Sequence, residues 1–286
     1  MSTDYIIGPD EQLHYTTDGT GAGSWVRLGL TQDGAMTEDS EVREQRAVGD
    51  HRPIALRPGL FRAFGNARFT IQNGAFLEQC LRTSGRLPAL AFRAGQPDNT
   101  QEYATHTQAK IDSLSLECAA GGEVVAGIDW KAENAAFNSS GIPDLSPSAN
   151  AAFMWYNTTI TGLANIGNER VDGGGLEVVS FASRIENNID WLPVIGTSEG
   201  RRAKYIREGT QRVTLSLRVL IPEDTNIAAN ELSYIESVVL NLSNGTQDVT
   251  ITLTDLLEGT FERPLRPEDL NTHGINLIAK AVSIAA

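Results

Sequence analysis

The sequence has little with which to hold a metal or to cross a membrane. Its 286 residues include four histidines and two cysteines, and no apolar run approaches the roughly 20 residues that a membrane-spanning helix needs. The histidines have no zinc-type spacing, and Cys80 and Cys118 sit in apolar patterns typical of small buried side chains. The first residues lack the basic region, apolar core and cleavage site of a secretion signal. We therefore expect no metal, no membrane segment and a reducing compartment.

Motifs for catalysis are also missing. The glycine cluster TDGTGAGS at 17–24 is not a dinucleotide fingerprint, because no strand leads into it and no helix with the required third glycine follows it. The sequence has no phosphate-binding lysine loop and no nucleophile-elbow serine. It therefore predicts a protein that is not an enzyme and that needs no cofactor.

Basic residues are outnumbered, and few of them are lysine. The net charge is −13, which argues against a protein that grips nucleic acid by neutralising phosphates, although nucleic acid could still slide past it. Of the 23 basic residues 19 are arginine, and eleven of these fall in two segments, 43–68 and 201–218. Arginine forms forked ion pairs and is enriched at protein interfaces. The clusters therefore predict contact surfaces, with base-composition bias or adaptation to high salt as the alternative.

What the sequence does contain is a long internal repeat. Each copy has a polar, arginine-bearing loop, a glycine and a long strand, followed by a short helical stretch (73–85 or 225–236) and an apolar strand (88–95 or 237–245). A fixed offset across several elements is typical of a duplicated structural unit. The matching positions are Arg52 and Arg202, Leu56 and Ile206, Arg57 and Arg207, Gly59 and Gly209, Arg62 and Arg212, and Ile71 and Ile221.

Polar and apolar residues alternate along several segments, which predicts half-buried antiparallel strands. The pattern is clear at 212–219 and 248–254, and residues 111–130 form a predicted hairpin that turns at 120–122. The sequence thus predicts a mainly β fold of duplicated antiparallel sandwich or partial-barrel units, each with one short α-helix and a long loop. The two long loops, 31–58 and 186–208, exceed the usual length and are expected to be functional.

Composition also suggests where the halves meet. Residues 138–152 are rich in Ser, Pro, Asn and Gly, as linkers are. We expect a first half over 1–137, a linker with a connecting strand over 138–175, and a second half over 176–286, beginning with a strand at 176–185.

Four blocks together resemble the tail tube, or major tail, proteins of tailed viruses. In the second half these are LEVVSFASRIENNIDWLPVIG (176–196) and YIREGTQRVTLSLRVLIP (205–222), and in the first half FTIQNGAFLEQCLRTSGRLPALAFRAG (69–95) and QAKIDSLSLECAAGGEVVAGIDWKAENA (108–135). The likeness runs from about Trp25 to the C-terminus and is specific in its order and spacing. Two features depart from it: Asp-Trp-Leu-Pro replaces the usual Glu-Pro, and the linker is unlike the family's.

The resemblance implies a structural protein of the virion tail, made in the host cytoplasm. Such proteins stack as rings around a tape-measure protein, and viral DNA later passes through the lumen without specific binding. The inner wall is a continuous β-barrel, which leaves no free sheet edges within a ring. Helices lie outside it, long loops reach the neighbouring ring, and a sheath protein surrounds the tube if the tail is contractile. The duplication predicts three chains per ring with pseudo-sixfold symmetry, with six chains as the alternative.

Two sets of residues are candidates for these roles, one for the contacts between rings and one for the lining of the lumen. The polar strand faces are expected to line the lumen, although they could instead face outward to solvent. The predicted inter-ring contacts are Arg52, Arg57, Arg202, Arg207, Asn187, Asn188 and Asp190. The predicted lumen residues are Glu117, Glu123, Asp129, Asp248 and Thr250.

Other functions remain open from the sequence. A carbohydrate-binding or adhesive β-sandwich would need exposed aromatic side chains gathered on one surface, but the four tryptophans are spread along the chain, and Trp130 lies in an apolar strand pattern that predicts core packing. Another ring-forming tail component, such as a terminator or a baseplate hub, is the second alternative.

Overall fold

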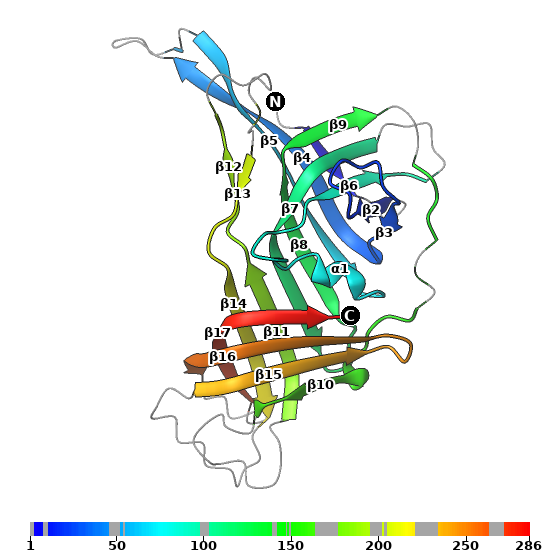
Figure 1. Ribbon diagram of the computed structural model, residues 1–286, viewed down its shortest axis with the longest axis vertical. Helices are drawn as coiled ribbons and strands as arrows, with labels where there is room; N and C mark the ends of the chain where they lie inside the picture. The colour runs from blue at the N-terminus through cyan, green and yellow to red at the C-terminus, as the bar shows by residue number, and fades with distance from the viewer. Residues whose placement is uncertain are drawn as a thin grey trace.

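Strands make up most of the chain, and fifteen of them join in one sheet (Figure 1). The mainly β prediction is therefore confirmed. The structure is a computed structural model, and it describes residues 3–7, 11–45, 52–53, 55–97, 103–138, 142–146, 148, 150–163, 177–194, 202, 205–220, 234–262 and 272–286.

Eight strands that are neighbours in the sheet form a curved antiparallel surface, here called the wall. Along most of these strands polar and apolar residues alternate, so that one face is buried and the other is open. In spatial order the wall strands are β4 (Leu30–Gln45), β5 (Ala55–Thr70), β8 (Val125–Ala132), β7 (Tyr103–Ala119), β11 (Glu177–Glu186), β14 (Arg212–Leu220), β17 (Thr272–Ala285) and β16 (Asp248–Glu262). The short β1 (Thr3–Ile6) pairs with β4 at one edge.

A second layer packs behind the wall. Figure 1 shows β15 and β16 crossing the direction of β11 and β14, with helix α1 (Ala75–Glu78) next to β17. The strands of this layer outside the wall are β2 (Gln12–Thr16), β3 (Val26–Arg27), β6 (Leu90–Gly95), β9 (Asn134–Asn138), β10 (Thr158–Thr161) and β15 (Tyr234–Ser243), and a 3-10 turn, η1, spans Trp155–Asn157. A separate two-stranded hairpin joins β12 (Asp190–Leu192) and β13 (Tyr205–Arg207).

The pairing pattern occurs twice along the chain. In the first run β4, β5, β8 and β7 are neighbours, with β6 on β7 and β2 on β6; in the second, β11, β14, β17 and β16 are neighbours, with β15 on β16 and β10 on β15. The repeated segment of the sequence forms β5 in the first run, and β13 and β14 in the second. The two runs meet where β7 pairs with β11. The repeat seen in the sequence is thus a repeat of whole-sheet topology.

Most of the expected elements form. The hairpin at 111–130 is confirmed as β7 and β8, with Leu114 opposite Ile128. The expected strands at 88–95, 176–185, 212–219, 237–245 and 248–254 correspond to β6, β11, β14, β15 and β16. The first expected helix forms over one turn as α1. Of the second, residues 225–233 lie outside the described residues, and Tyr234 to Glu236 begin β15 instead.

The two stretches expected to be long loops contain hairpins instead. Residues 31–58 belong largely to β4 and β5, which extend beyond the rest of the molecule at the top of Figure 1. Residues 186–208 include β12 and β13. At its tip the β4–β5 hairpin is exposed on both faces, so its residues lack the alternation that marks a half-buried strand.

One apolar core fills the space between the wall and the second layer. Trp130 of β8 is fully buried, as expected, and its ring stacks on Phe92 of β6 with centroids 4.4 Å apart. Phe76 of α1 packs edge-on against Tyr15 and Phe92. The two cysteines are free and buried. These aromatic contacts attach the second layer to the wall.

Replacing Gly65 by alanine is expected to destabilise the protein by about 1–3 kcal/mol through overpacking. A methyl group there would lie 2.3 Å from Cζ2 of Trp130, a fully buried ring that stacks on Phe92. Urea unfolding measures the loss. Gly259→Ala is the matched control, because the atom nearest to its added methyl group, the Asn276 carbonyl oxygen, is 3.6 Å away. Equal stability of the two variants would contradict this account of the Trp130 site.

Candidate functional site

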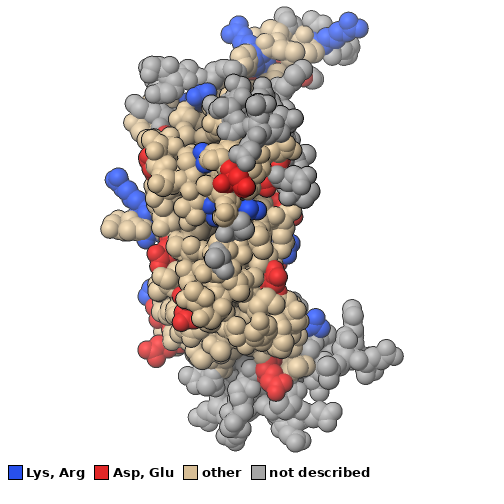
Figure 2. Space-filling model, turned by 90° about the vertical axis from the view of Figure 1, so that its right-hand side faces the viewer, with Lys and Arg blue, Asp and Glu red and all other residues tan. Residues whose placement is uncertain are grey.

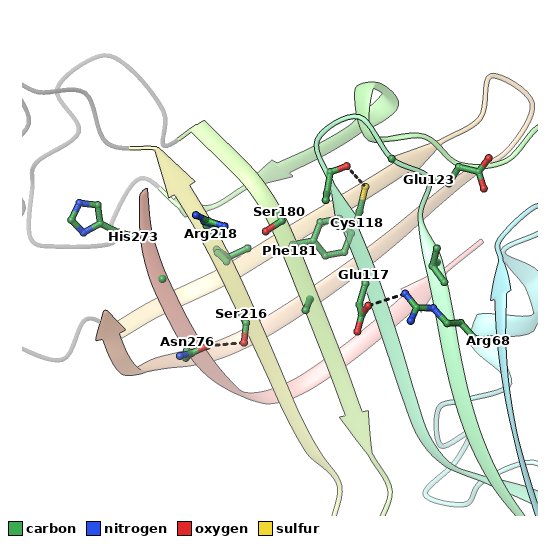
Figure 3. A pocket seen from close by; sticks show the side chains of 16 residues that line it. Arg68, Glu117, Cys118, Glu123, Ser180, Phe181, Ser216, Arg218, His273 and Asn276 are labelled. Carbon is green, nitrogen blue, oxygen red and sulfur yellow. Dashed lines mark hydrogen bonds and ion pairs between the residues drawn. The ribbon is translucent and has the colours of Figure 1, made fainter. Parts of the chain in front are cut away.

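The open face of the wall carries a broad concavity. It has a volume of about 890 Å³ and is lined from six neighbouring strands (Figure 3). Glu117 of β7, Ser180 of β11, Ser216 of β14 and Asn276 of β17 line it, with Arg68 of β5 at one side. The Ser216 hydroxyl donates to Oδ1 of Asn276 over 2.7 Å. A hollow that spans so many strands shows that the wall curves toward its polar face.

Charges of both signs occupy this open face. Arg68 and Glu117 approach to 3.4 Å, and Arg184 and Glu186 to 3.0 Å. Each pair is at least partly exposed, so it adds little stability. It does, however, place a carboxylate beside an arginine that could otherwise hold a phosphate. The face is therefore mixed in charge, although the chain as a whole is acidic.

Three of the five predicted lumen residues lie together on the wall. Glu117 and Glu123 line the concavity. Glu123 accepts a hydrogen bond of 2.9 Å from the Thr70 hydroxyl, and Asp129 accepts one of 2.6 Å from Ser113. All three carboxylates are exposed, and the residue that follows each of them in the chain is buried.

The other two predicted lumen residues, Asp248 and Thr250, lie elsewhere. They belong to the first part of β16, where Ser243 is opposite Asp248 and Asn241 is opposite Thr250 in β15. That part of the strand runs in the second layer, with Val249 facing the core. Polar and apolar residues alternate in the same way in both layers. Asp248 and Thr250 differ from Glu117 because the part of β16 that carries them lies in the second layer and not in the wall.

A second group of features lies at the end of the molecule where the β4–β5 and β12–β13 hairpins project. A groove of about 510 Å³ separates them, lined by Glu41, Arg62, Asp190, Trp191 and Arg202 among others. Figure 2 shows basic side chains at the projecting end of the molecule, where the β4–β5 hairpin lies. Polar and apolar groups thus lie side by side at this end.

Exposed apolar side chains also gather on the two hairpins. Leu56 is 64% exposed and Val42 54% on the β4–β5 hairpin, and Tyr205 is 50% exposed on β13. Leu192 and Val194 add to them on the β12 side. Exposed apolar groups beside charged ones are typical of a protein–protein contact surface.

Of the predicted contact residues, the four arginines are exposed at this end. Arg52 and Arg57 belong to the β4–β5 hairpin, and Arg207 ends β13 opposite Asp190. Arg202 donates to Oδ1 of Asn134 over 3.0 Å, and its guanidinium lies 5.2 Å from the centroid of the Phe61 ring. Burial raises the pKa of Glu38, and the nearby Arg202 opposes that shift.

The predicted contact residue Asn187 has an internal role instead. Its side chain is fully buried. Its amide nitrogen donates to the carbonyl oxygens of Cys80 and Ile111, each over 3.1 Å, and its amide oxygen accepts from Gln211 over 2.9 Å. Asn187 therefore joins the two runs of strands, and its side chain has no surface for a neighbouring ring.

Asn188 shapes the base of the β12–β13 hairpin. It has a left-handed backbone with φ of 50°, and its side chain donates to the Thr210 carbonyl over 2.7 Å. A Cβ on Gly209 would lie 2.3 Å from the Asn188 carbonyl oxygen. Asp190, in contrast, is exposed and caps the Trp191 amide over 2.8 Å.

Two ion pairs between lysines and carboxylates, which sequence reasoning missed, also hold the β12–β13 hairpin in place. Lys110 and Glu208 approach to 2.5 Å, and Lys131 lies 2.9 Å from Asp112. Burial alone would raise the pKa of Glu208, but hydrogen bonds from Lys110 and the Leu87 amide bring it below its usual value. The scarcity of lysine was the available signal, because two of the four lysines in the chain are used here.

Trp191 is the other residue whose role was not foreseen. Its indole nitrogen donates to the Ala132 carbonyl over 3.2 Å, and Lys131 and Arg62 lie 5.2 and 5.7 Å from its ring. Cation–π contacts of this kind hold the β12–β13 hairpin against the wall. The groove between the hairpins is thus a preformed feature of the single chain.

The described residues show no sign of a metal site or a membrane helix. They contain no group of three histidine, cysteine or acidic side chains that could hold a metal ion. No helix in the described part of the chain is long and apolar enough to span a bilayer.

The wall, its open face and the projecting hairpins define a protein whose sheet and surfaces suit contact with further copies of itself. Residues 10–281 match the model of the phage tail tube protein family, and the chain belongs to that family. A comparison with curated proteins finds no match. A solved structure similar to the chain is the tube-terminating cap of the anti-feeding prophage, at 16% identity over 52% of this chain and 97% of that one. With a TM-score of 0.30, that likeness carries no argument about function.

Family membership confirms the function expected from the resemblance. The protein is a structural component of the virion tail and assembles with itself into the rings of the tail tube, the conduit for the genome. The family is a structural one and not a class of enzymes.

Proposed function

We propose that three chains close each ring, so that their walls form one continuous β-barrel with pseudo-sixfold symmetry. The observation that carries this is the repeated pairing order, in which the β7–β11 contact already joins two like runs of strands. In the proposed division these runs correspond to a first half over 1–137 and a second half over 176–286, with β10 of the second run lying in the linker at 138–175. A contact of the same kind between chains, from β16 to β4, would continue the sheet with no free edge. The strands of the second layer then lie outside the barrel.

Counting the chains in a ring tests this arrangement. Native mass spectrometry of isolated rings, or class averages of tubes seen end-on, should give three chains per ring. Six chains would contradict it and would place only one unit of each chain on the barrel.

The open face of the wall is the proposed lining of the lumen, with Glu117, Glu123 and Asp129 on it. Two of its arginines, Arg68 and Arg184, lie beside carboxylates, which reduces their attraction for phosphate. DNA would then pass without specific binding, after a tape-measure protein has occupied the same lumen during assembly. A sheath protein, if the tail is contractile, would contact the outer layer.

Replacing both Glu123 and Asp129 by lysine is expected to slow genome delivery severalfold while tubes still assemble. Each added lysine recurs in every ring along the bore, where it attracts DNA phosphate. The measurement is the rate of DNA release from particles that carry the variant. Asp248→Lys is the control, because Asp248 is in the second layer. Unchanged release from the double variant would count against a lumenal position.

The projecting hairpins are the proposed inter-ring contacts. Arg52, Arg57, Arg202 and Arg207 would pair with carboxylates of the next ring, and the exposed Leu56 and Tyr205 would be covered there. Asn188 and Asp190 contribute by shaping the hairpin. Asn187 is excluded from this set by its burial.

A further inference from the structure

The edge strand of the wall is covered by a short strand from the same chain. β1 pairs antiparallel with β4, from Thr3 opposite Glu38 to Ile6 opposite Ala35. β4 is the first strand of the wall, and its other side pairs with β5. Over residues 35–38, therefore, both sides of this edge strand are paired.

The internal repeat shows what pairs at the equivalent place in the second run. Ala67 of β5 and Leu217 of β14 are equivalent by the sequence offset, and they lie opposite Gly34 of β4 and Phe181 of β11. Residues 35–38 of β4 thus correspond to residues 182–185 of β11. On β11 those residues pair antiparallel with β7, from Ala182 opposite Glu117 to Ile185 opposite Leu114. β1 occupies on β4 the position that β7 occupies on β11.

The strand equivalent to β7 is β16, and its edge is available at the matching place. β7 pairs with β6 as far as Ala109 and then with β11 from Ser113 onward. β16 pairs with β15 as far as Leu257. Beyond that point, within the described residues, 258–262 pair with β17 on one side only. Like β7, β16 leaves its neighbour in the second layer part of the way along the strand. β7 then pairs with β11 on that side, whereas among the described residues no strand pairs with 258–262 of β16 on the corresponding side.

We propose that β1 is a removable plug that covers residues 35–38 of β4 until the end of β16 from a second copy takes its place. This inference rests on the proposed closed ring. An uncovered edge strand pairs readily with other chains, so a cover keeps free chains apart. The exchange replaces one set of antiparallel backbone hydrogen bonds by another of the same kind. Because β1 has only four residues, a longer contact between two walls can displace it.

A reversible covalent lock tests the plug. Asp4 and Thr37 are opposite each other in the β1–β4 pair, and opposed residues on antiparallel strands are close enough for a disulfide. The full-length chain with Asp4→Cys and Thr37→Cys, oxidised, is expected to stay unassembled. After addition of dithiothreitol, it should form rings and tubes as the unmodified chain does. Sedimentation and negative-stain images give the readout, and the native Cys80 and Cys118 are buried.

A second lock serves as the matched control. Thr159→Cys with Asn241→Cys joins β10 to β15, a pair in the second layer that stays together in the ring. This variant should assemble whether oxidised or reduced. At equal protein concentration, we expect at least a tenfold difference in sedimenting material between the two oxidised locks.

The outcomes separate the plug from the ring. If the oxidised Asp4–Thr37 lock forms tubes like its reduced form, β1 is not displaced and the plug is refuted while the ring stands. Loss of assembly in both oxidised locks would equally overturn the role of β1. If the unmodified and the reduced chains form no rings at any concentration, the closed ring and the plug both fail.

Discussion

A chain with Arg57→Glu and Arg207→Glu is expected to fold normally and to form no tubes. The two arginines are equivalent in the internal repeat, and both are exposed at the end where the hairpins project. Reversing them changes the charge at two positions of every chain, and these changes recur around each ring. Like charges facing each other across an interface oppose association strongly. Loss of tubes should therefore be complete at concentrations where the unmodified chain assembles.

The measurement combines circular dichroism, for the fold, with sedimentation and electron microscopy, for tubes. Arg68→Glu with Arg184→Glu is the matched control, because it changes the net charge equally on the open face of the wall. That control should still form tubes. Normal tubes from the Arg57 and Arg207 variant would refute the inter-ring role of the two hairpins.

Asn187→Ala is expected to lower the free energy of unfolding by about 3 kcal/mol. The substitution leaves two buried carbonyl groups, of Cys80 and Ile111, without their donor, and removes the acceptor of Gln211. Each buried polar group left without a partner costs about 1–3 kcal/mol. The loss should appear as a lower midpoint of urea unfolding with an unchanged slope.

The adjacent Asn188 supplies the control for that measurement. Asn188→Gly keeps a residue suited to the left-handed backbone at φ of 50° and removes one exposed hydrogen bond to Thr210. We expect it to change stability by well under half as much as Asn187→Ala. Equal effects at the two positions would show that the buried contacts of Asn187 do not join the two runs of strands.

Local alternation made much of the wall predictable. The strands at 111–130 and 212–219 bury one face and expose the other, so their side chains record the environment directly. The tip of the β4–β5 hairpin has no buried face and no such record, which is why residues 31–58 were expected to form a loop. Residues 186–208 were also expected to form a long loop, with Asn187 among its inter-ring contacts. Burial of Asn187 depends on carbonyl groups that are distant in the sequence.

The sequence by itself determined the duplication, the mainly β class and the polar face of each strand, because repeats and period-two patterns are local properties of a chain. Only the tertiary structure decided which layer each polar face belongs to. It placed Asp248 and Thr250 behind the wall and Glu117 on its open face. It also placed β1 on the edge of β4. The reason is physical: strand order and layer depend on pairing between segments far apart in the chain, and alternation is the same whichever partner a strand finds.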